Sequence, residues 1–593
     1  MHLTEQWAFR EGSAPEKTFR FGQDFMIDLD RPAGRKGNRG DECVISNRFR
    51  LQKETELGFG AGADYWFEAK LNGEIICTTF PAGNVFPEIS HRNYQFRGVG
   101  KAGENLLEIR VRRGVKSWRF HFREEDPAKI DPCTVWKYSL APEAPAKTEP
   151  CAPLTVEADP AAVLGRIKPM NAVNNGPIKA RSTQSRGNFD AFRALEIPYV
   201  RNHDASFCSA YGGEHTVDIH AVFPDFSKDP TDPASYDFAS TDRYLKTIME
   251  SGGKVFYRLG SKIEHAPEKY GTKVPPDFRK WAVVCEHIIR HFNEGWAGGF
   301  HMNIEYWEIW NEPDLPNEGN GSPTWQGTPE EFFELYRVTA LHLKKCFPKL
   351  KIGGPALAGL LPWMEKFLFA MKAAPRVPLD FFSWHFYGSD PRRAARKGEV
   401  IRKLLDENGY RETESILDEW NYVRDWSANF TYSIHQIIGL KGAAFGAAMM
   451  IRCQDAPLDM LMYYDARPTV FNGLFGYYDY APLKTYHVFA AWAKLARLGT
   501  QIKVDVKGRR GISATGATDG KGRIGIMIAR FFEEDDLPGE VPLTLKVKGV
   551  DLRGAKLYLL DEKHDLADVP CRMTAEGEIR FSMAANTVLY LEK

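Results

Sequence analysis

The sequence predicts a multidomain α/β plus β protein, with a central (β/α)8 (TIM) barrel flanked by two β-sandwiches. Period-2 alternation runs to about residue 130, eight short β-branched or aromatic runs then alternate with helical patterns, and strand patterns return after about residue 500. At ~150 residues per domain, 593 residues suffice for three or four domains. We expect a jelly-roll-like N-terminal β-sandwich over 1–140, a linker over 141–160, the barrel over 161–498 and a C-terminal β-sandwich over 499–593.

The N-terminal region consists of short alternating runs separated by turn residues. Asn72-Gly73 joins the runs 64–71 and 74–79, and an Asn-Gly pair between two strands is the strongest short-range hairpin signal. With the Gly-Glu-Asn sequence that follows, this pattern resembles the galactose-binding-like jelly rolls attached to many glycosidases. Trp66 and Trp118 lie within strand patterns, which favours packing in a core over a carbohydrate-binding platform.

A stretch rich in Pro, Ala and charged residues at 141–153 is typical of a linker. Eight strand-helix repeats over the ~340 residues beyond it favour a closed barrel over an open doubly wound sheet. No GxGxxG sequence follows the first strand, which argues against a dinucleotide-binding fold. The predicted strands are 169–173, 197–202, 254–259, 304–310, 351–354, 381–386, 415–418 and 460–464, and the predicted helices include 277–292, 330–346, 394–407, 434–451 and 483–498.

Charge and composition disfavour several classes of function. Lys plus Arg (78) equals Asp plus Glu (78), so no excess positive field holds nucleic acid or anionic lipid. No apolar run approaches the ~18 to 20 residues that cross a bilayer, and the first residues lack a signal-peptide stretch. Nine scattered cysteines without a CxxC pair argue against a disulfide framework or a structural zinc site. We expect either a cytoplasmic protein or one whose leader has been removed, without nucleic-acid or membrane partners, and the sequence leaves the oligomeric state open.

Two strand ends carry a Glu among bulky aromatic residues, and the working residues of such barrels lie at the C-terminal ends of their strands. One sequence is Trp307-Glu-Ile-Trp-Asn-Glu312-Pro313, and the other is Ser415-Ile-Leu-Asp-Glu419-Trp-Asn421. Aromatic neighbours desolvate a carboxyl and raise its pKa toward that of a general acid, while a second Glu stays ionised and attacks. Carboxyls ~5 Å apart about a glycosidic bond give retention, and ~6.5 to 9.5 Å gives inversion.

The segment ending in Trp-Asn-Glu-Pro resembles the acid/base signature of clan A glycoside hydrolases, most closely family 39, the group of β-xylosidases and α-L-iduronidases. The likeness covers roughly Lys168 to Leu498. Further segments similar to that family lie at 199–203, 236–242, 251–255, 380–387, 471–476 and 484–489.

The resemblance implies a role for each matching residue. Glu312 is the general acid/base, and Glu419 is the nucleophile. Asn311 holds the 2-hydroxyl of the sugar, a contact that strengthens as the oxocarbenium-like transition state develops. Arg201 lies beside Glu419 and keeps it ionised. The other expected substrate-binding residues are His203, His385, Tyr387, Asp465 and Trp420, of which His385 and Tyr387 either line the sugar subsite or bond the nucleophile.

The chain also departs from that family. Around Glu419 the family usually has Thr-Glu-Phe, whereas this chain has Asp418-Glu419-Trp420-Asn421, which is closer to family 51 arabinofuranosidases and leaves the sugar specificity open. We expect the insertion over 204–235 to shape the substrate pocket.

Several residues have a second interpretation. Glu308 is expected in a buried ion pair rather than in catalysis. Arg258, Lys262 and Arg467 either bind a uronate carboxylate or are solvated loop charges. The histidines at 203, 215, 220 and 385 show no HxH or HExxH spacing, so no metal site is expected.

The sequence therefore predicts a retaining exo-glycoside hydrolase of the β-xylosidase type, which removes a terminal pentose from an oligosaccharide or glycoside without a cofactor. Specificity like that of an α-L-arabinofuranosidase, a β-galactosidase or an α-L-iduronidase stays open on the same site. A non-catalytic carbohydrate-binding barrel and a metal-dependent hydrolase are the alternatives from other classes.

Overall fold

The chain forms two compact units, Met1–Pro150 and Cys151–Lys593. The computed structural model describes residues 2–22, 25–38, 40–79, 89–91, 93–114, 117–127, 130, 154–180, 182, 186–203, 217–316, 321–359, 363–426, 430–469, 471–508, 511–535 and 537–593.

The first unit is the predicted β-sandwich. Asn72 and Gly73 both adopt positive φ (54° and 88°) and join Leu71 to its strand partner Glu74, so the predicted hairpin is confirmed. Trp118 is 1% exposed within the core between the sheets. One sheet has the order β2 (Lys17–Phe19), β1 (Trp7–Arg10), β4 (Glu42–Leu51), β9 (Gly103–Arg113), β6 (Tyr65–Leu71) and β7 (Glu74–Thr78), and the other has the order β3 (Met26–Asp28), β10 (Arg119–Glu125), β5 (Thr55–Ala63) and β8 (Tyr94–Gly100), with helix α1 at Asp30–Ala33.

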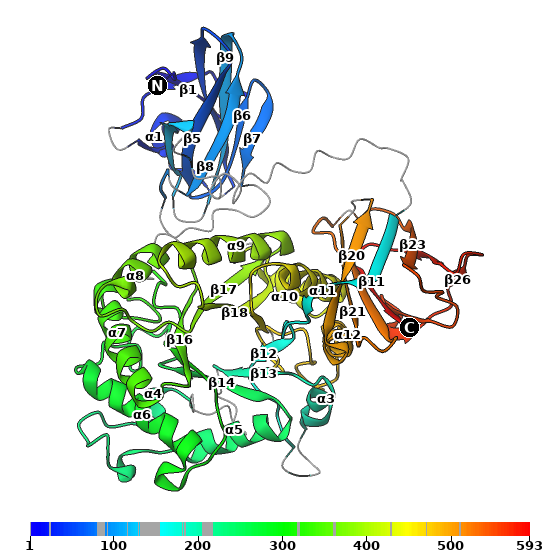
Figure 1. The fold of residues 1–593 in the computed structure, drawn as a ribbon. Helices are drawn as coiled ribbons and strands as arrows, with labels where there is room; N and C mark the ends of the chain where they lie inside the picture. Colours follow the sequence, from blue (N-terminus) through cyan, green and yellow to red (C-terminus); the bar gives the residue numbers. More distant parts are fainter. Residues whose placement is uncertain are drawn as a thin grey trace. The chain divides into compact units, whose positions relative to one another are not determined.

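Eight parallel strands close into the predicted barrel in the second unit (Figure 1). All eight predicted strands are present: β12 (Ala172–Asn174), β13 (Tyr199–Asn202), β14 (Lys254–Leu259), β15 (Tyr306–Ile309), β16 (Lys351–Leu357), β17 (Phe381–Gly388), β18 (Glu414–Tyr422) and β19 (Met460–Tyr463). Around them lie α3 (Phe189–Ala194), α4 (Ile219–Val222), α5 (Ala239–Glu250), α6 (Phe278–Glu294), α7 (Pro329–Cys346), α8 (Trp363–Lys372), α9 (Pro391–Glu407), α10 (Phe430–Ile437), α11 (Leu440–Asp455) and α12 (Lys484–Leu498), with short 3-10 turns η2 (Pro233–Ser235) and η3 (Trp296–Gly298).

The helix predicted over 434–451 is two helices, α10 and α11, which meet at 80°. The break includes Gly439, which has a low helix propensity. Within the described part of the chain, no single helix is long and apolar enough to cross a membrane, and α10 and α11 pass that test only as this bent pair.

Side chains that point into the barrel form an apolar layer beneath a polar one. The apolar layer contains Phe256, Tyr306, Phe381, Ile416 and Met462, among others. Since side chains alternate along a strand, the next inward position lies two residues further on. Those positions include Asn174, Arg201, Arg258, Glu308 and Asp418, all of them 0% exposed.

A β-bulge in β18 brings two consecutive carboxyls into the interior. In the pairing with β17, Leu417 is followed by Glu419, opposite His385, so Asp418 stands outside the register. Such a bulge re-aims side chains. Asp418 and Glu419 consequently both contact Arg201 of β13.

The C-terminal domain is one ten-stranded sheet that packs against the barrel helices α11 and α12. In β22, Met527 and Ala529 join the barrel core while Ile526 and Ile528 join a second core on the other face. Burial on both faces explains the continuous apolar run of this strand. The strand order is β25 (Asp565–Asp568), β24 (Lys556–Leu560), β28 (Thr587–Glu592), β22 (Ile524–Arg530), β21 (Ile512–Thr518), β20 (Thr500–Lys507), β11 (Leu154–Arg166), β23 (Val541–Val547), β27 (Ile579–Met583) and β26 (Arg572–Met573).

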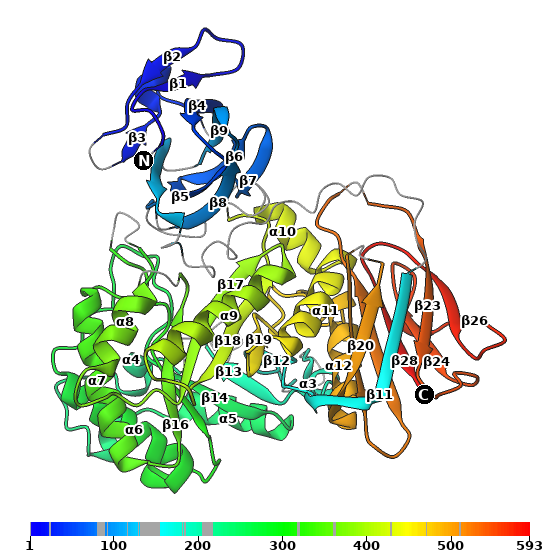
Figure 2. The ribbon, with the colours of Figure 1, turned by 45° about the horizontal axis from the view of Figure 1, so that its top comes forward.

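The predicted linker over 141–160 is wrong from Leu154 onward, because this part is strand β11. Figure 2 shows β11 among the strands of the C-terminal domain, where it pairs with β20 and β23. The buried alternate positions Leu154, Val156 and Ala158 fit between these neighbours. The sheet therefore takes a central strand from before the barrel.

Candidate active site

Glu312 is held on a tight turn directly after β15. Trp310 and Glu312 both adopt positive φ (77° and 50°), a conformation that surrounding contacts must hold in non-glycine residues. The backbone N–H of Glu312 donates to the Ala356 carbonyl at 3.0 Å, and the Thr324 hydroxyl donates to the Glu312 carbonyl at 2.5 Å. These bonds fix the direction of the Glu312 side chain. The residue is only 6% exposed.

Glu419, on β18, receives donors from two other strands. Arg201 Nη1 donates to Oε1 at 2.7 Å, and the Tyr387 hydroxyl donates to Oε2 at 2.7 Å. His203 Nε2 lies 3.5 Å from Oε1. These groups stabilise the ionised carboxylate.

The carboxyls of Glu312 and Glu419 face each other with His385 between them. One oxygen of each carboxyl and one ring nitrogen of His385 all lie within 4.8 Å of one another. His385 Nδ1 is 2.8 Å from Glu312 Oε1 and 3.5 Å from Glu419 Oε2. The two predicted catalytic residues therefore share one site.

Asn311 presents a donor to this site. Its Oδ1 accepts from Arg201 Nη2 at 2.7 Å, which orients the amide. Its Nδ2 is buried and makes no hydrogen bond among the described residues. A buried donor is costly to leave unpaired, so this nitrogen is well suited to a hydroxyl of a bound ligand.

Burial and charge act in opposite directions on the buried titratable groups. Burial raises the pKa of Glu419 above its usual value, and His385 and Arg201 oppose the rise. Burial disfavours the charged form of His385, but the negative charges of Glu419, Asp418 and Glu312 raise its pKa well above the usual value. The site therefore favours a cationic His385.

The other expected substrate ligands divide into those at the site and those elsewhere. Arg201, His203, His385 and Tyr387 meet at the two carboxyls, as described above. Asp465 accepts the backbone N–H of Arg467 at 2.9 Å and Asn175 Nδ2–H at 3.3 Å. These contacts hold the turn after β19, and a role for Asp465 in binding hydroxyls stays a prediction.

Trp420 was expected in the substrate site, and this expectation is wrong. Its ring is fully buried and packs against Tyr463 and against Phe445 of α11. Glu419 takes the inward position after the bulge, so the next residue faces the helices.

Most of the residues that had two interpretations are now placed. Glu308 makes the expected buried contact with Arg201, at 2.7 Å. Arg258 is neither solvated nor free, because it is 0% exposed and pairs with Asp218 at 2.6 Å. Arg467 is 2% exposed and donates to the Gly176 carbonyl at 3.1 Å. His215 and most of the expected pocket insertion, residues 204–216, lie outside the described residues.

Two further residues support the site without a sequence signal that singles them out. Asn174 accepts from Arg201 Nη1 at 3.1 Å and donates to the Asp418 carbonyl at 2.7 Å. Asp314 accepts the backbone N–H groups of Ala358 and Gly359, and burial raises its pKa to about 6. Both residues are polar and adjoin a strand end, but so are many residues without a role.

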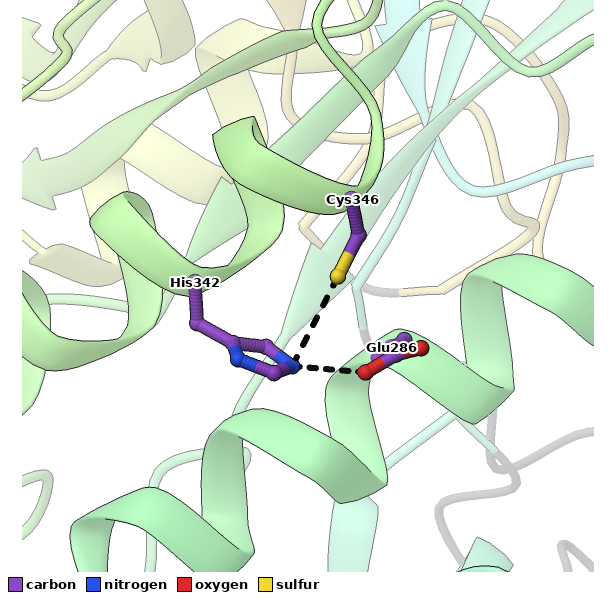
Figure 3. A group of neighbouring side chains, drawn as sticks. All are labelled: Glu286, His342 and Cys346. Carbon is purple, nitrogen blue, oxygen red and sulfur yellow. Dashed lines mark hydrogen bonds and ion pairs between the residues drawn. The ribbon is translucent and has the colours of Figure 1, made fainter.

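A second cluster of titratable residues lies outside the barrel, on α6 and α7 (Figure 3). His342 Nε2 is 2.6 Å from Glu286 and 3.9 Å from the Cys346 sulfur. Both contacts use the same ring nitrogen, whereas a proton relay through imidazole needs opposite nitrogens. Arg290 pairs with the other oxygen of Glu286 at 2.8 Å. The cluster therefore joins the two helices.

The closed (β/α)8 barrel brings an Asn-Glu pair from strand four and a second Glu from strand seven to one point, which is the pair of carboxyls that hydrolysis of a glycosidic bond uses. Residues 171–430 match the model of the glycosyl hydrolases family 39. This match agrees with the resemblance to that family that the sequence predicted.

Two named relatives match part of this chain, and a solved structure shares its fold. The chain is 38% identical over 199 residues to a β-xylosidase of Geobacillus stearothermophilus, 32% of this chain and 37% of that one. It is 31% identical over 198 residues to a β-xylosidase of Caldicellulosiruptor saccharolyticus, 29% of this chain and 38% of that one. The matches thus span well under half of each relative. A glucosidase structure from Croceicoccus marinus shares the fold, with a TM-score of 0.60 and 23% identity over 74% of this chain and 99% of its own.

Proposed function

We propose that this protein is a retaining exo-glycoside hydrolase that removes a terminal pentose, of the β-xylosidase type, from oligosaccharides or glycosides. The observation that carries the proposal is the approach of Glu312 and Glu419 to within 4.8 Å between their nearest oxygens. Retaining enzymes separate their carboxyls by ~5 to 5.5 Å, and inverting enzymes by ~6.5 to 9.5 Å to admit a water molecule.

The reaction follows from the position of each group. Glu312 donates its proton to the glycosidic oxygen while a Glu419 oxygen attacks the anomeric carbon and forms a glycosyl ester. Glu312, now ionised, removes a proton from the water that hydrolyses the ester. Asn311 Nδ2–H donates to the 2-hydroxyl in both steps, and Arg201 and Tyr387 hold Glu419 in line.

Two considerations favour an uncharged pentose over a uronate. The two relatives described above are both named β-xylosidases, whereas human α-L-iduronidase is 24% identical over 220 residues. A uronate would need an unpaired cation near the sugar ring, and the guanidinium groups of Arg201 and Arg258 already pair with the buried carboxyls of Asp418 and Asp218.

A panel of p-nitrophenyl glycosides tests the proposal. We expect the highest kcat/KM on the β-xyloside, with α-L-arabinofuranoside, β-galactoside and α-L-iduronide analogues below it. NMR of the first-formed product should show the anomer of the substrate. An inverted product would contradict the two-step mechanism, and calorimetric sugar binding without hydrolysis of any glycoside would favour a non-catalytic carbohydrate-binding barrel.

Trp426 is expected to bind the leaving sugar. It is 57% exposed and lies 5.1 Å from the ring of Tyr387, the residue that bonds Glu419. Phe471 stacks against it at 6.0 Å and supports it. Stacking contributes ~1 kcal/mol, so Trp426→Ala should lower kcat/KM about fivefold on xylobiose and little on methyl β-xyloside.

Phe369→Ala is the matched control for this prediction, because Phe369 is 70% exposed on helix α8 and has no part in the site. Steady-state kinetics on both substrates provide the comparison. Equal losses on xylobiose and on methyl β-xyloside would show that Trp426 supports the site and does not bind the leaving sugar.

A further inference from the structure

Beneath the two catalytic carboxyls lies a second carboxyl pair that the mechanism above does not use. Glu308 and Asp418 are both 0% exposed, and each carboxyl shifts the pKa of the other. Both also pair with Arg201, at 2.7 and 3.1 Å. Glu308 Oε1 and the Asp418 oxygens otherwise make no hydrogen bond among the described residues. Two carboxylates in contact away from water do not both ionise, so one proton lies between them.

The surroundings place this proton on Glu308. Burial, together with the neighbouring charge of Asp418, raises the pKa of Glu308 well above its usual value. Burial also opposes ionisation of Asp418, but Arg201 and His385 outweigh it and lower the pKa of Asp418. The directions of these two pKa shifts therefore favour the proton on Glu308 and the charge on Asp418.

His385 connects this pair to the catalytic carboxyls. Its Nε2 lies 3.6 Å from Asp418 Oδ1, and its Nδ1 lies 2.8 Å from Glu312 Oε1 and 3.5 Å from Glu419 Oε2. The other charged or titratable groups packed around it are Arg201 and His203 of β13, Glu308 of β15, Tyr387 of β17 and Lys397 of α9, which donates to the His385 carbonyl at 3.0 Å. Three acidic groups thus surround one imidazole.

We propose that His385 is a fixed imidazolium whose Nδ1–H follows the negative charge from Glu419 to Glu312 during the first half-reaction, and that Asp418 is the positioning residue that keeps it charged. This inference rests on the proposed function for its catalytic half only. The protonation state of His385 is a property of the protein without substrate.

The charges balance at each stage. Before attack, Glu419 is ionised and Glu312 carries the proton. As the bond from Glu419 to the anomeric carbon forms, the bond to the leaving oxygen breaks and that oxygen takes the proton of Glu312. The negative charge has then moved to Glu312, and His385 Nδ1 lies within 3.5 Å of both positions. Arg201 and His385 are cations at every stage. They face two anions, which are Asp418 and either Glu419 before the attack or Glu312 after it.

The experiment uses the full chain labelled with 15N-histidine, with His385→Gln to assign the signals of residue 385. We expect the imidazolium signature for His385 in the wild type at pH 7. Asp418→Asn keeps the shape and removes the charge, so the titration midpoint should move to lower pH by roughly 1 to 3 units.

Glu308→Gln is the matched control. Its amide nitrogen donates to Asp418 and its oxygen accepts from Arg201, as a protonated Glu308 would, so the titration midpoint of His385 should stay at the wild-type value. A neutral imidazole in the wild type at pH 7, or an unchanged midpoint in Asp418→Asn, would overturn the proposal. A charged His385 in a protein that hydrolyses no glycoside would support the protonation assignment and contradict the proposed function.

Discussion

Glu419→Ala is expected to lower kcat by on the order of 10⁴-fold, equivalent to about 5 kcal/mol of transition-state stabilisation, on every glycoside. The loss does not depend on the leaving group, because no other described group takes the position of the attacking oxygen. Arg201 keeps its partners Glu308 and Asp418, so the fold should persist. Steady-state kinetics on p-nitrophenyl β-xyloside and on xylobiose measure the effect, and thermal denaturation checks the fold.

Glu414→Ala is the matched control for this variant. Glu414 lies on the same strand at the opposite end of the barrel, where it pairs with Lys351 at 2.7 Å. Its loss should leave kcat close to the wild-type value. Addition of azide to Glu419→Ala should restore part of the rate with inversion, because the small anion fits the space of the missing carboxylate. A wild-type rate in Glu419→Ala would show that another group is the nucleophile.

Glu312→Gln is expected to lower kcat/KM by up to ~10⁴-fold on xylobiose, whose leaving group needs a proton, and far less on 2,4-dinitrophenyl β-xyloside, whose leaving group does not. This dependence on the leaving group distinguishes an acid from a group that merely binds. The measurement uses a series of aryl xylosides of graded leaving-group pKa. A plot of log kcat/KM against that pKa should be steeper for the variant than for the wild type.

Glu305→Gln is the control for this series. Glu305 comes just before the same strand and pairs with Lys351 at 3.0 Å, far from the turn that holds Glu312. For Glu305→Gln, the slope of log kcat/KM against leaving-group pKa should match that of the wild type. Equal losses across the series in Glu312→Gln would remove the acid role and leave Glu312 as a binding group.

Local patterns in the sequence were enough to predict most elements. The Asn72-Gly73 hairpin depends on two residues that tolerate positive φ, and the eight barrel strands depend on short apolar runs between helical patterns. Strand β11 was missed because its partners, β20 and β23, lie more than 300 residues further along the chain. Its alternation at Leu154, Val156 and Ala158 was present but adjoined a proline-rich stretch.

The residues of the candidate site also divide into those that the sequence predicted and those that it did not. The Trp-Asn-Glu-Pro motif and Glu419 were recognisable because each adjoins a strand end. Trp420 was misplaced because strict alternation along β18 fails at the bulge. No residue type in that strand predicts a bulge. The same bulge brings Asp418 to Arg201 and His385, so its function was not apparent from sequence.

The sequence alone determined which segments become the eight barrel strands, that these strands alternate with helices, and which two Glu residues lie toward the C-terminal ends of strands four and seven. Only the tertiary structure decided that Glu308, Asp418 and His385 form one charged group beneath those residues. The physical reason is that hydrophobic periodicity is local, whereas a pKa depends on distances of a few ångströms between side chains from different strands. Closure of the barrel and one bulge set those distances.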